Sequence, residues 1–125
     1  MENITTQEYQ TITPYLIIPG AVKFIRFLQD VFGATEKYKA MRTEDTVMHA
    51  EMIIGNSTIM LADSTDEHSS QPAGLFINVP DADATFQKAV DAGATVIMPP
   101  ADQDYGRSGG VKDAFGNTWW ITTVK

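Results

Sequence analysis

The side chains best suited to chemistry in this sequence are a histidine and a glutamate two positions apart. His49 and Glu51 lie in a β-rich segment, 47–54, and alternate residues of a strand point to the same face. Imidazole changes charge near neutral pH, and an adjacent carboxylate orients it and stabilises its charged form. We interpret the two residues either as an acid–base or hydrogen-bonding pair in a pocket, or as a solvated pair on an outer surface.

Other kinds of reactive site find little support. The sequence has no cysteine, which excludes disulfides, thiolate nucleophiles and cysteine-based zinc sites and suits a reducing cytoplasm. His68 lies in a polar stretch, where we expect it to be solvated. The glycine-rich segment 106–110 lacks the strand-to-helix setting of a phosphate-binding loop, so nucleotide binding is not expected.

The composition is that of an acidic globular protein. Of 125 residues, 43% are hydrophobic and 20% charged, with a formal net charge of −7. The acidity favours solubility and would also favour cationic ligands. The nine lysines and arginines are scattered and form no basic patch for nucleic acid. Because the sequence also shows no long apolar run and no basic start of a signal peptide, we expect a cytoplasmic protein with no nucleic-acid or membrane partner.

The elements that must position His49 and Glu51 are repeated along the chain. Gly33-Ala34-Thr35 ends an apolar helical stretch, and Gly93-Ala94-Thr95 ends another sixty residues later. Gly55-Asn56 precedes a β-rich segment, and Gly116-Asn117 precedes a second one 61 residues later. Such self-similarity indicates two equivalent halves. A short domain of this kind usually encloses a cavity, where small molecules bind.

Each half is predicted to contain a strand, a helix and three more strands. In the first half the strands are 11–18, 35–42, 47–54 and 57–63, with a helix from Ala21 that Gly33 ends. In the second half they are 75–79, 95–98, 106–112 and 117–124, with a helix that Asp81 caps and Gly93 ends. We predict a single domain, 1–125, made of module 1 (about 11–63), a linker (64–72) and module 2 (about 73–125), with a loose arm at 1–10.

Several short strings in these halves point to one family. In the first half they are Thr13-Pro14-Tyr15-Leu16, Phe27, Phe32-Gly33-Ala34, Val47-Met48-His49-Ala50-Glu51 and Met60-Leu61-Ala62-Asp63. In the second half they are Ala92-Gly93-Ala94-Thr95-Val96 and Asp113-Ala114-Phe115-Gly116-Asn117. In this order, from Thr11 to Lys125, the chain resembles the bleomycin-resistance-like group of the vicinal oxygen chelate superfamily, which includes glyoxalases and extradiol dioxygenases.

The resemblance implies a fold and an assembly. The expected fold is α+β, with two βαβββ modules forming curved mixed sheets around a cavity and the helices on the convex side. Relatives of this length commonly pair halves between chains, so we expect a homodimer, which is also the commonest homo-oligomer.

The resemblance also shows where a metal would be held. Enzymes of the superfamily bind a divalent ion through inward-pointing His and Glu side chains. Carried over to this sequence, the four ligand places are Thr13, Met60, Gly74 and Trp120. None of them suits the ions of this chemistry, because a thioether prefers soft copper and glycine and tryptophan offer no donor. We expect no metal and no cofactor.

The same alternation of strand faces predicts what lines the cavity instead. The residues expected there are Tyr15, His49, Glu51, Met60, Phe76, Asn78 and Trp120, with Tyr105 and Arg107 at the mouth. An aromatic wall with a few polar groups is typical of small-molecule sites. Trp120, Phe76 and Met60 would equally serve as core residues.

Three functions follow from this reading. The first is a metal-free protein of the bleomycin-resistance type that sequesters a bulky aromatic or cationic compound, stacked on Trp120, Phe76 and Tyr15. The second is a metal-free enzyme of the isomerase or lyase type, in which His49 and Glu51 act as general base and orienting residue. The third, a metal-dependent glyoxalase or dioxygenase, requires ligands that the sequence does not show. Whether the protein is an enzyme stays open, and His49 and Glu51 are its only catalytic candidates.

Overall fold

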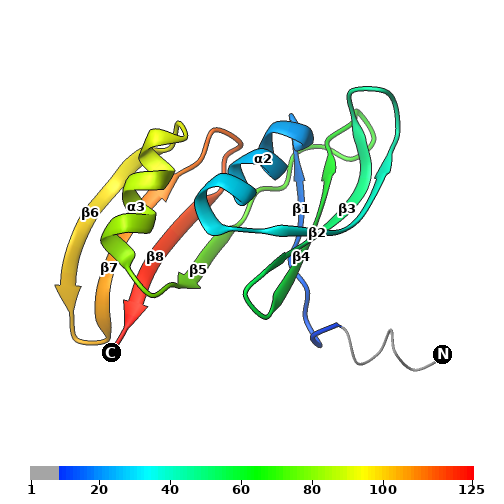
Figure 1. The fold of residues 1–125 in the computed structure, drawn as a ribbon. Coiled ribbons are helices and arrows are strands. Elements are labelled where there is room, and N and C mark those ends of the chain that lie inside the picture. The colour runs from blue at the N-terminus through cyan, green and yellow to red at the C-terminus, as the bar shows by residue number, and fades with distance from the viewer. Residues whose placement is uncertain (1–8) are drawn as a thin grey trace. The chain divides into compact units, whose positions relative to one another are not determined.

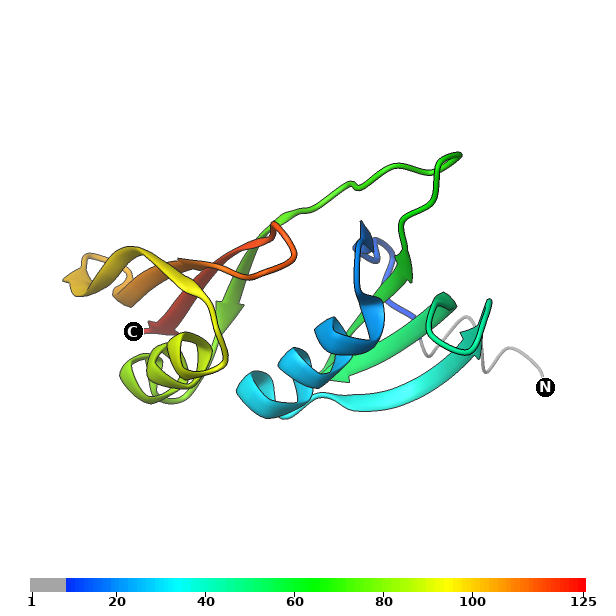
Figure 2. The same ribbon diagram turned by 90° about the horizontal axis from the view of Figure 1, so that it is seen from above.

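The computed structural model describes residues 9–125, which form two compact units. Unit 1 runs to Gln71, and unit 2 runs from Pro72 to Lys125 together with Asp30–Phe32. The division after Gln71 falls inside the predicted linker. Each unit is a four-stranded mixed sheet with one helix on one of its faces (Figure 1, Figure 2). The predicted α+β class, with two strand-helix-three-strand modules, is thereby confirmed.

Unit 1 contains β1 (Tyr15–Ile18), α2 (Ala21–Phe32) as far as Gln29, β2 (Thr35–Met41), β3 (Val47–Ile54) and β4 (Ser57–Asp63). Its strand order is β1-β4-β3-β2, with β1 parallel to β4 and the other neighbours antiparallel. Helix α2 buries its apolar stripe, including Phe24 and Leu28, together with strand residues such as Leu61 and Met52. This stripe follows the three- and four-residue spacing that predicted the helix.

The buried carboxylate of Asp63 fixes the start of α2. Its Oδ1 accepts hydrogen bonds from the backbone N–H of Gly20 at 3.0 Å and of Ala21 at 3.1 Å. Its Oδ2 accepts one from the N–H of Val47 at 2.6 Å. One side chain at the end of β4 therefore satisfies backbone donors at the start of α2 and at the start of β3. Its negative charge also interacts favourably with the dipole of α2.

Unit 2 consists of β5 (Gly74–Asn78), α3 (Ala82–Asp91), β6 (Thr95–Gln103), β7 (Gly106–Lys112) and β8 (Thr118–Val124). Its order, β5-β8-β7-β6, repeats that of unit 1. Asp81 caps α3 as predicted, with its carboxylate accepting from the N–H of Ala84. The buried Asp113 shapes the turn before β8, because it accepts hydrogen bonds from the N–H of Phe115 and of Asn117 and from the indole N–H of Trp119.

Two strands differ from their predicted bounds by more than one residue. Strand β6 continues to Gln103, although the sequence predicts an end near Met98 before Pro99 and Pro100. The strand lies at the edge of its sheet, and its register shifts between Met98 and Ala101, which is where a strand tolerates prolines. Strand β1 begins only at Tyr15.

The end of the predicted loose arm is attached to unit 1. Gln10 donates from Nε2 to the carbonyl of Thr58 at 2.7 Å and accepts from the Thr58 N–H at 3.2 Å. The expectation of a loose arm is therefore wrong for Tyr9 and Gln10, and the rest of it, 1–8, lies outside the described residues. Within the described part of the chain, no helix is long and apolar enough to cross a membrane.

Candidate functional site

In unit 1, a row of side chains crosses the sheet on the face opposite α2. The strand register aligns Tyr15 with Met60, Met60 with Glu51, and Glu51 with Tyr38. His49 is two residues before Glu51 on β3 and so shares this face. The structure thus places Tyr15, His49, Glu51 and Met60, all predicted site residues, on one face of unit 1.

Three of these side chains, Glu51, His49 and Tyr15, form a continuous hydrogen-bonded chain with Tyr9. Tyr9 donates its hydroxyl to Glu51 Oε1 at 2.6 Å, and His49 Nε2 lies 2.8 Å from Glu51 Oε2. The hydroxyl of Tyr15 lies 2.8 Å from His49 Nδ1. Both oxygens of the carboxylate and both ring nitrogens of the imidazole therefore have partners. The sequence predicted His49 and Glu51 on one strand face, either as a pair in a pocket or as a solvated pair, and in the structure they are hydrogen-bonded to each other.

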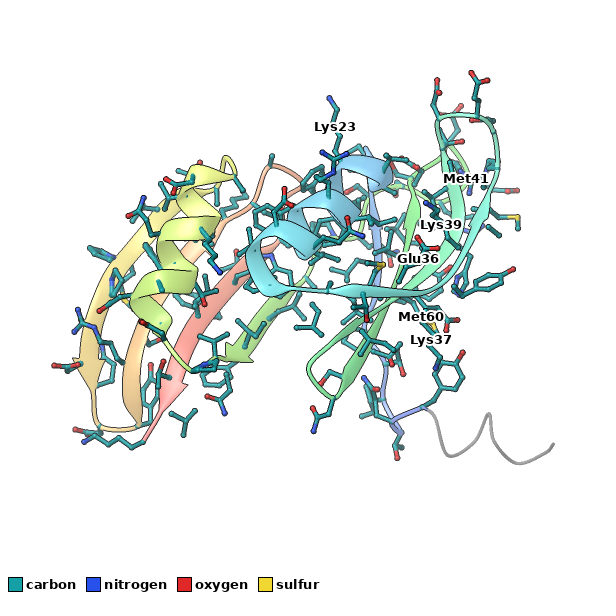
Figure 3. The ribbon with its side chains drawn as sticks, viewed as in Figure 1. Lys23, Glu36, Lys37, Lys39, Met41 and Met60 are labelled. Carbon is teal, nitrogen blue, oxygen red and sulfur yellow. The ribbon has the colours of Figure 1, made fainter. Side chains whose placement is uncertain are left out.

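The carboxylate at the centre of this chain is buried and charged. Glu51 is 7% exposed. Its burial acts to raise the pKa, but hydrogen bonds from Tyr9 and His49 and the positive charges of His49 and Lys37 outweigh burial and hold the pKa of Glu51 below its ordinary value. Lys37 Nζ lies 3.7 Å from the centre of the Tyr9 ring, a cation–π contact beside the carboxylate. Figure 3 labels Lys37 and Met60, which both lie toward the described N-terminal end of the chain.

Around His49 and Glu51, Tyr9, Lys37 and Tyr38 complete a cluster with Tyr15 and Met60. Sequence reasoning missed three residues of this cluster: Tyr9, Lys37 and Tyr38. Tyr9 belongs to a segment without hydrophobic periodicity, so nothing in the sequence placed it on the sheet. Lys37 has no register partner, because the pairing of β2 with β3 shifts between Glu36 and Tyr38. Such an irregularity puts an extra residue into a strand and leaves no mark in an alternating pattern. Only Tyr38, on a predicted strand, could have been found by alternation.

In unit 2, two aromatic side chains occupy the sheet face opposite α3. Phe76 and Trp120 are register partners on β5 and β8, and Trp120 is in turn the partner of Gly110 on β7. A Cβ atom at position 110 would collide with Trp120 Cζ3 and lie 2.7 Å from Cε3. The Trp120 ring thus covers the place where other residues would carry a side chain. Trp120 is 36% exposed, whereas Trp119, on the opposite face, is 2% exposed.

The other predicted residues of unit 2 are engaged elsewhere. Asn78 is on the face of Phe76, but its amide oxygen accepts from the Val124 N–H at 3.2 Å. Tyr105 lies in the turn between β6 and β7 and is exposed. Arg107 Nε donates to the carboxylate of Asp83 on α3 at 2.9 Å.

The register confirms that Arg107 is on the helix side of its sheet. Its partner is Thr123, whose hydroxyl accepts from the N–H of Ala82 at the start of α3. An open cavity of about 420 Å³ adjoins it, lined by Asp102, Gln103, Gly106, Arg107, Thr123, Val124 and Lys125. The structure therefore does not bring Arg107 to the face of Phe76 and Trp120, and we leave it out of the site proposed below.

The comparisons with known proteins decide the family. Residues 13–121 match the model of the Glyoxalase/Bleomycin resistance protein/Dioxygenase superfamily. The chain belongs to this superfamily. An uncharacterised protein of Mycobacterium bovis is a relative at 32% identity over 120 residues, covering 86% of this chain and 79% of that protein. An uncharacterised protein of Arabidopsis thaliana is 29% identical over 116 residues, covering 81% and 70%.

Solved structures of other proteins share the superfamily fold. TioX from Micromonospora sp. ML1 superposes with a TM-score of 0.77 at 20% identity, covering 93% of this chain and 99% of TioX. The fosfomycin resistance protein FosX from Mesorhizobium loti superposes with a TM-score of 0.66 at 19% identity, covering 93% and 92%. At these identities the likeness extends to the fold alone.

Superfamily membership raises the question of a metal, and the residues present do not fit one. Of the four places carried over from the superfamily resemblance, Thr13 offers only a neutral hydroxyl, Met60 offers a thioether, and Gly74 and Trp120 offer no donor. No group of three or more His, Cys, Asp or Glu side chains suited to a metal occurs among residues 9–125. His49 and Glu51 are hydrogen-bonded to each other and to tyrosines, so the atoms that could bind a metal are already engaged.

Proposed function

We propose that this protein binds a bulky aromatic compound, neutral or cationic, without a metal. The observation that carries the proposal is the pair Phe76 and Trp120, both exposed on one face of unit 2, with the Trp120 ring seated over Gly110. Because the Trp120 ring packs over Gly110, it presents a wide planar surface and has little conformational freedom to lose on binding. Small-molecule sites are built mainly from such aromatic surfaces.

A positive charge on the ligand would strengthen the interaction. The faces of aromatic rings attract cations, and the formal net charge of the chain is −7. Lys37 against the Tyr9 ring, beside Glu51, shows that unit 1 already holds a cation in this way. Two neighbours of the same fold are fosfomycin resistance proteins, which is consistent with a small-molecule ligand for this chain as well.

Calorimetry with two matched probes tests the proposal. 1-Naphthylmethylamine is cationic and 1-naphthalenemethanol is neutral, and both carry the same ring system. We expect both to bind, the amine more tightly, and Trp120→Ala to weaken binding several-fold to a hundredfold, the range of about 1–3 kcal/mol for a buried aromatic contact.

The control variant is Trp119→Phe, because Trp119 lies on the helix side of the same strand. It should lower the melting temperature and leave the affinity unchanged. Equal affinity of the Trp120→Ala variant and the wild type for both probes would show that Trp120 does not contact the ligand, and absence of binding by the wild type would reject this ligand class.

A second function, metal-free proton-transfer catalysis of the isomerase or lyase type, is favoured by the hydrogen-bonded chain of unit 1. A buried carboxylate that orients an imidazole, which in turn contacts a phenol, is the arrangement that general acid–base catalysis uses. The test is exchange of substrate protons for deuterium by the wild type and not by His49→Gln.

We also propose that the protein is a homodimer. Relatives of this length commonly pair their halves between chains, and two-fold pairing is the commonest homo-oligomer. Light scattering at micromolar concentration should give twice the chain mass of 13.7 kDa, and a monomer mass would reject the proposal.

A further inference from the structure

The two nitrogens of the His49 ring are both engaged, so His49 cannot contact a substrate directly. Nε2 faces the Glu51 carboxylate at 2.8 Å, and Nδ1 faces the Tyr15 hydroxyl at 2.8 Å. In the neutral ring, a carboxylate partner at Nε2 places the hydrogen there and leaves Nδ1 as an acceptor. The proton of Tyr15 is then directed at His49, and the remaining lone pairs of the Tyr15 oxygen point away from it.

We propose that Tyr15, and not His49, is the residue of unit 1 that receives a proton from a substrate. This inference rests on the second function proposed above and names its catalytic residue. The bond between the substrate and its hydrogen breaks, and that proton joins the Tyr15 oxygen. The original phenol proton passes to His49 Nδ1, and the electron pair stays on the substrate. No oxidant or other reactant is needed.

The rest of the cluster stabilises the charge that this transfer creates. As His49 becomes positive, the Glu51 carboxylate against Nε2 offsets the charge, as in other nucleophile–base–carboxylate arrangements. Tyr9 donates to the other oxygen of Glu51 and keeps it from rotating away. Lys37 is a further charge near the carboxylate, and Tyr38 lies with its ring centre 6.0 Å from that of His49.

The expected substrate is a neutral weak acid, such as an enol, a phenol or a carbon acid. In the state that can take up the proton, neither Tyr15 nor the His49 ring is charged, so they do not attract an anion, and the Glu51 carboxylate beside them repels one. The site offers no metal to stabilise the product anion, since its donor atoms are already bonded within the chain. The substrate must therefore stabilise its own negative charge by delocalisation.

Acetylation by N-acetylimidazole tests whether His49 activates the Tyr15 oxygen. The same lone pair attacks the acetyl carbon, the phenol proton passes to His49, and the departing imidazole takes up a proton from the charged His49 ring or from water. Tyr38 and Tyr105 are internal references because their exposed fractions, 52% and 51%, match the 46% of Tyr15. At neutral pH, peptide mapping by mass spectrometry should find Tyr15 acetylated about tenfold or more faster than either, given the usual contribution of a positioned base.

Substitution of His49 separates activation from mere accessibility. Glutamine at position 49 still accepts a hydrogen bond from Tyr15 but takes up no proton, so His49→Gln should reduce the Tyr15 rate to that of Tyr105. Circular dichroism confirms that the variant is folded. The proposal is overturned if Tyr15 reacts no faster than Tyr38 and Tyr105, or if His49→Gln leaves its rate unchanged.

A second reagent distinguishes failure of this inference from failure of proton-transfer catalysis itself. Diethylpyrocarbonate modifies accessible imidazoles, and the exposed His68 serves as the reference. We expect His49 to react more slowly than His68, because both of its nitrogens are hydrogen-bonded. If His49 is modified rapidly and Tyr15 is acetylated slowly, His49 is the base that contacts the substrate and this inference is wrong. If both residues react slowly, the proposed catalysis is rejected as well.

Discussion

Gly110 and Trp120 are adjacent on neighbouring strands, and the indole ring of Trp120 occupies the space above the Gly110 backbone. A methyl group at position 110 would collide with Cζ3 of the ring. Gly110 is buried, so the ring has to move to admit the methyl group. We therefore predict that Gly110→Ala displaces Trp120 and lowers the free energy of unfolding by about 1–3 kcal/mol, the usual cost of overpacking. It should also weaken binding of 1-naphthylmethylamine. Chemical denaturation and calorimetry measure the two effects.

The matched control is Gly74→Ala on β5. Gly74 belongs to the same sheet, and a Cβ atom at this position has nothing within 4 Å. Its backbone is not left-handed, so alanine should be neutral or slightly stabilising through the unfolded state. If Gly110→Ala behaved like Gly74→Ala in both measurements, the Trp120 ring would not depend on this glycine.

Asp63 should be among the side chains on which the stability of unit 1 depends most. Its carboxylate accepts three backbone hydrogen bonds, at the starts of α2 and β3. In Asp63→Asn, the amide NH₂ would have to face either the Val47 N–H or the donors of Gly20 and Ala21, and two donors cannot bond to each other. We expect the free energy of unfolding to fall by roughly 2–3 kcal/mol, as for hydrogen bonds lost from a charged group. Asp66→Asn, in the exposed linker, makes the same chemical change and should have almost no effect.

Glu51 should make the stability of the protein depend on pH in the acidic range. The pKa of Glu51 in the folded protein lies below its ordinary value of 4.5, so the unfolded chain binds more protons between these two values. The stabilisation by Glu51 is therefore fully present above about pH 4.5 and is lost as the pH falls through the folded pKa. Denaturation curves at several pH values should show a steeper acid loss for the wild type than for Glu51→Gln.

Glu67→Gln in the exposed linker is the control for this pH dependence. It removes the same kind of carboxylate where no hydrogen bond to it is formed by Tyr9 or His49, so its acid profile should match that of the wild type. Parallel profiles for the wild type and Glu51→Gln would mean that Glu51 has the same pKa in both states.

The sequence predicted the helices and most strands because their signals are local. Gly33 ends α2 in a left-handed conformation, Asp81 caps α3, and β3, β4 and β7 have the bounds that the sequence predicted. Where local rules conflict with tertiary context, prediction was incomplete. Pro99 and Pro100 argue against a strand, and only the position of β6 at a sheet edge permits one there.

The candidate site could be predicted only in part, for the same reason. Alternation placed Tyr15, Glu51 and Met60 on one face, because their strands are regular. Arg107 was expected at the mouth of the cavity, but its strand turns that position toward α3, where Asp83 holds it. The position of Tyr9 depends on a long-range hydrogen bond to Glu51, 42 residues away in the chain, which no local pattern encodes.

Metal removal should leave the protein unchanged. The four places inherited from metal-binding relatives carry no suitable donor set, and the imidazole of His49 and the carboxylate of Glu51 are bonded to each other and to tyrosines. We predict that elemental analysis of untagged protein finds well below one zinc, iron or nickel per chain, and that EDTA does not shift the melting temperature. Zinc added after EDTA treatment should likewise leave it unshifted, because a metal bound only by the folded state would raise it. A stoichiometric metal, or a melting temperature that falls with EDTA and recovers with zinc, would show that donors outside the positions considered hold an ion.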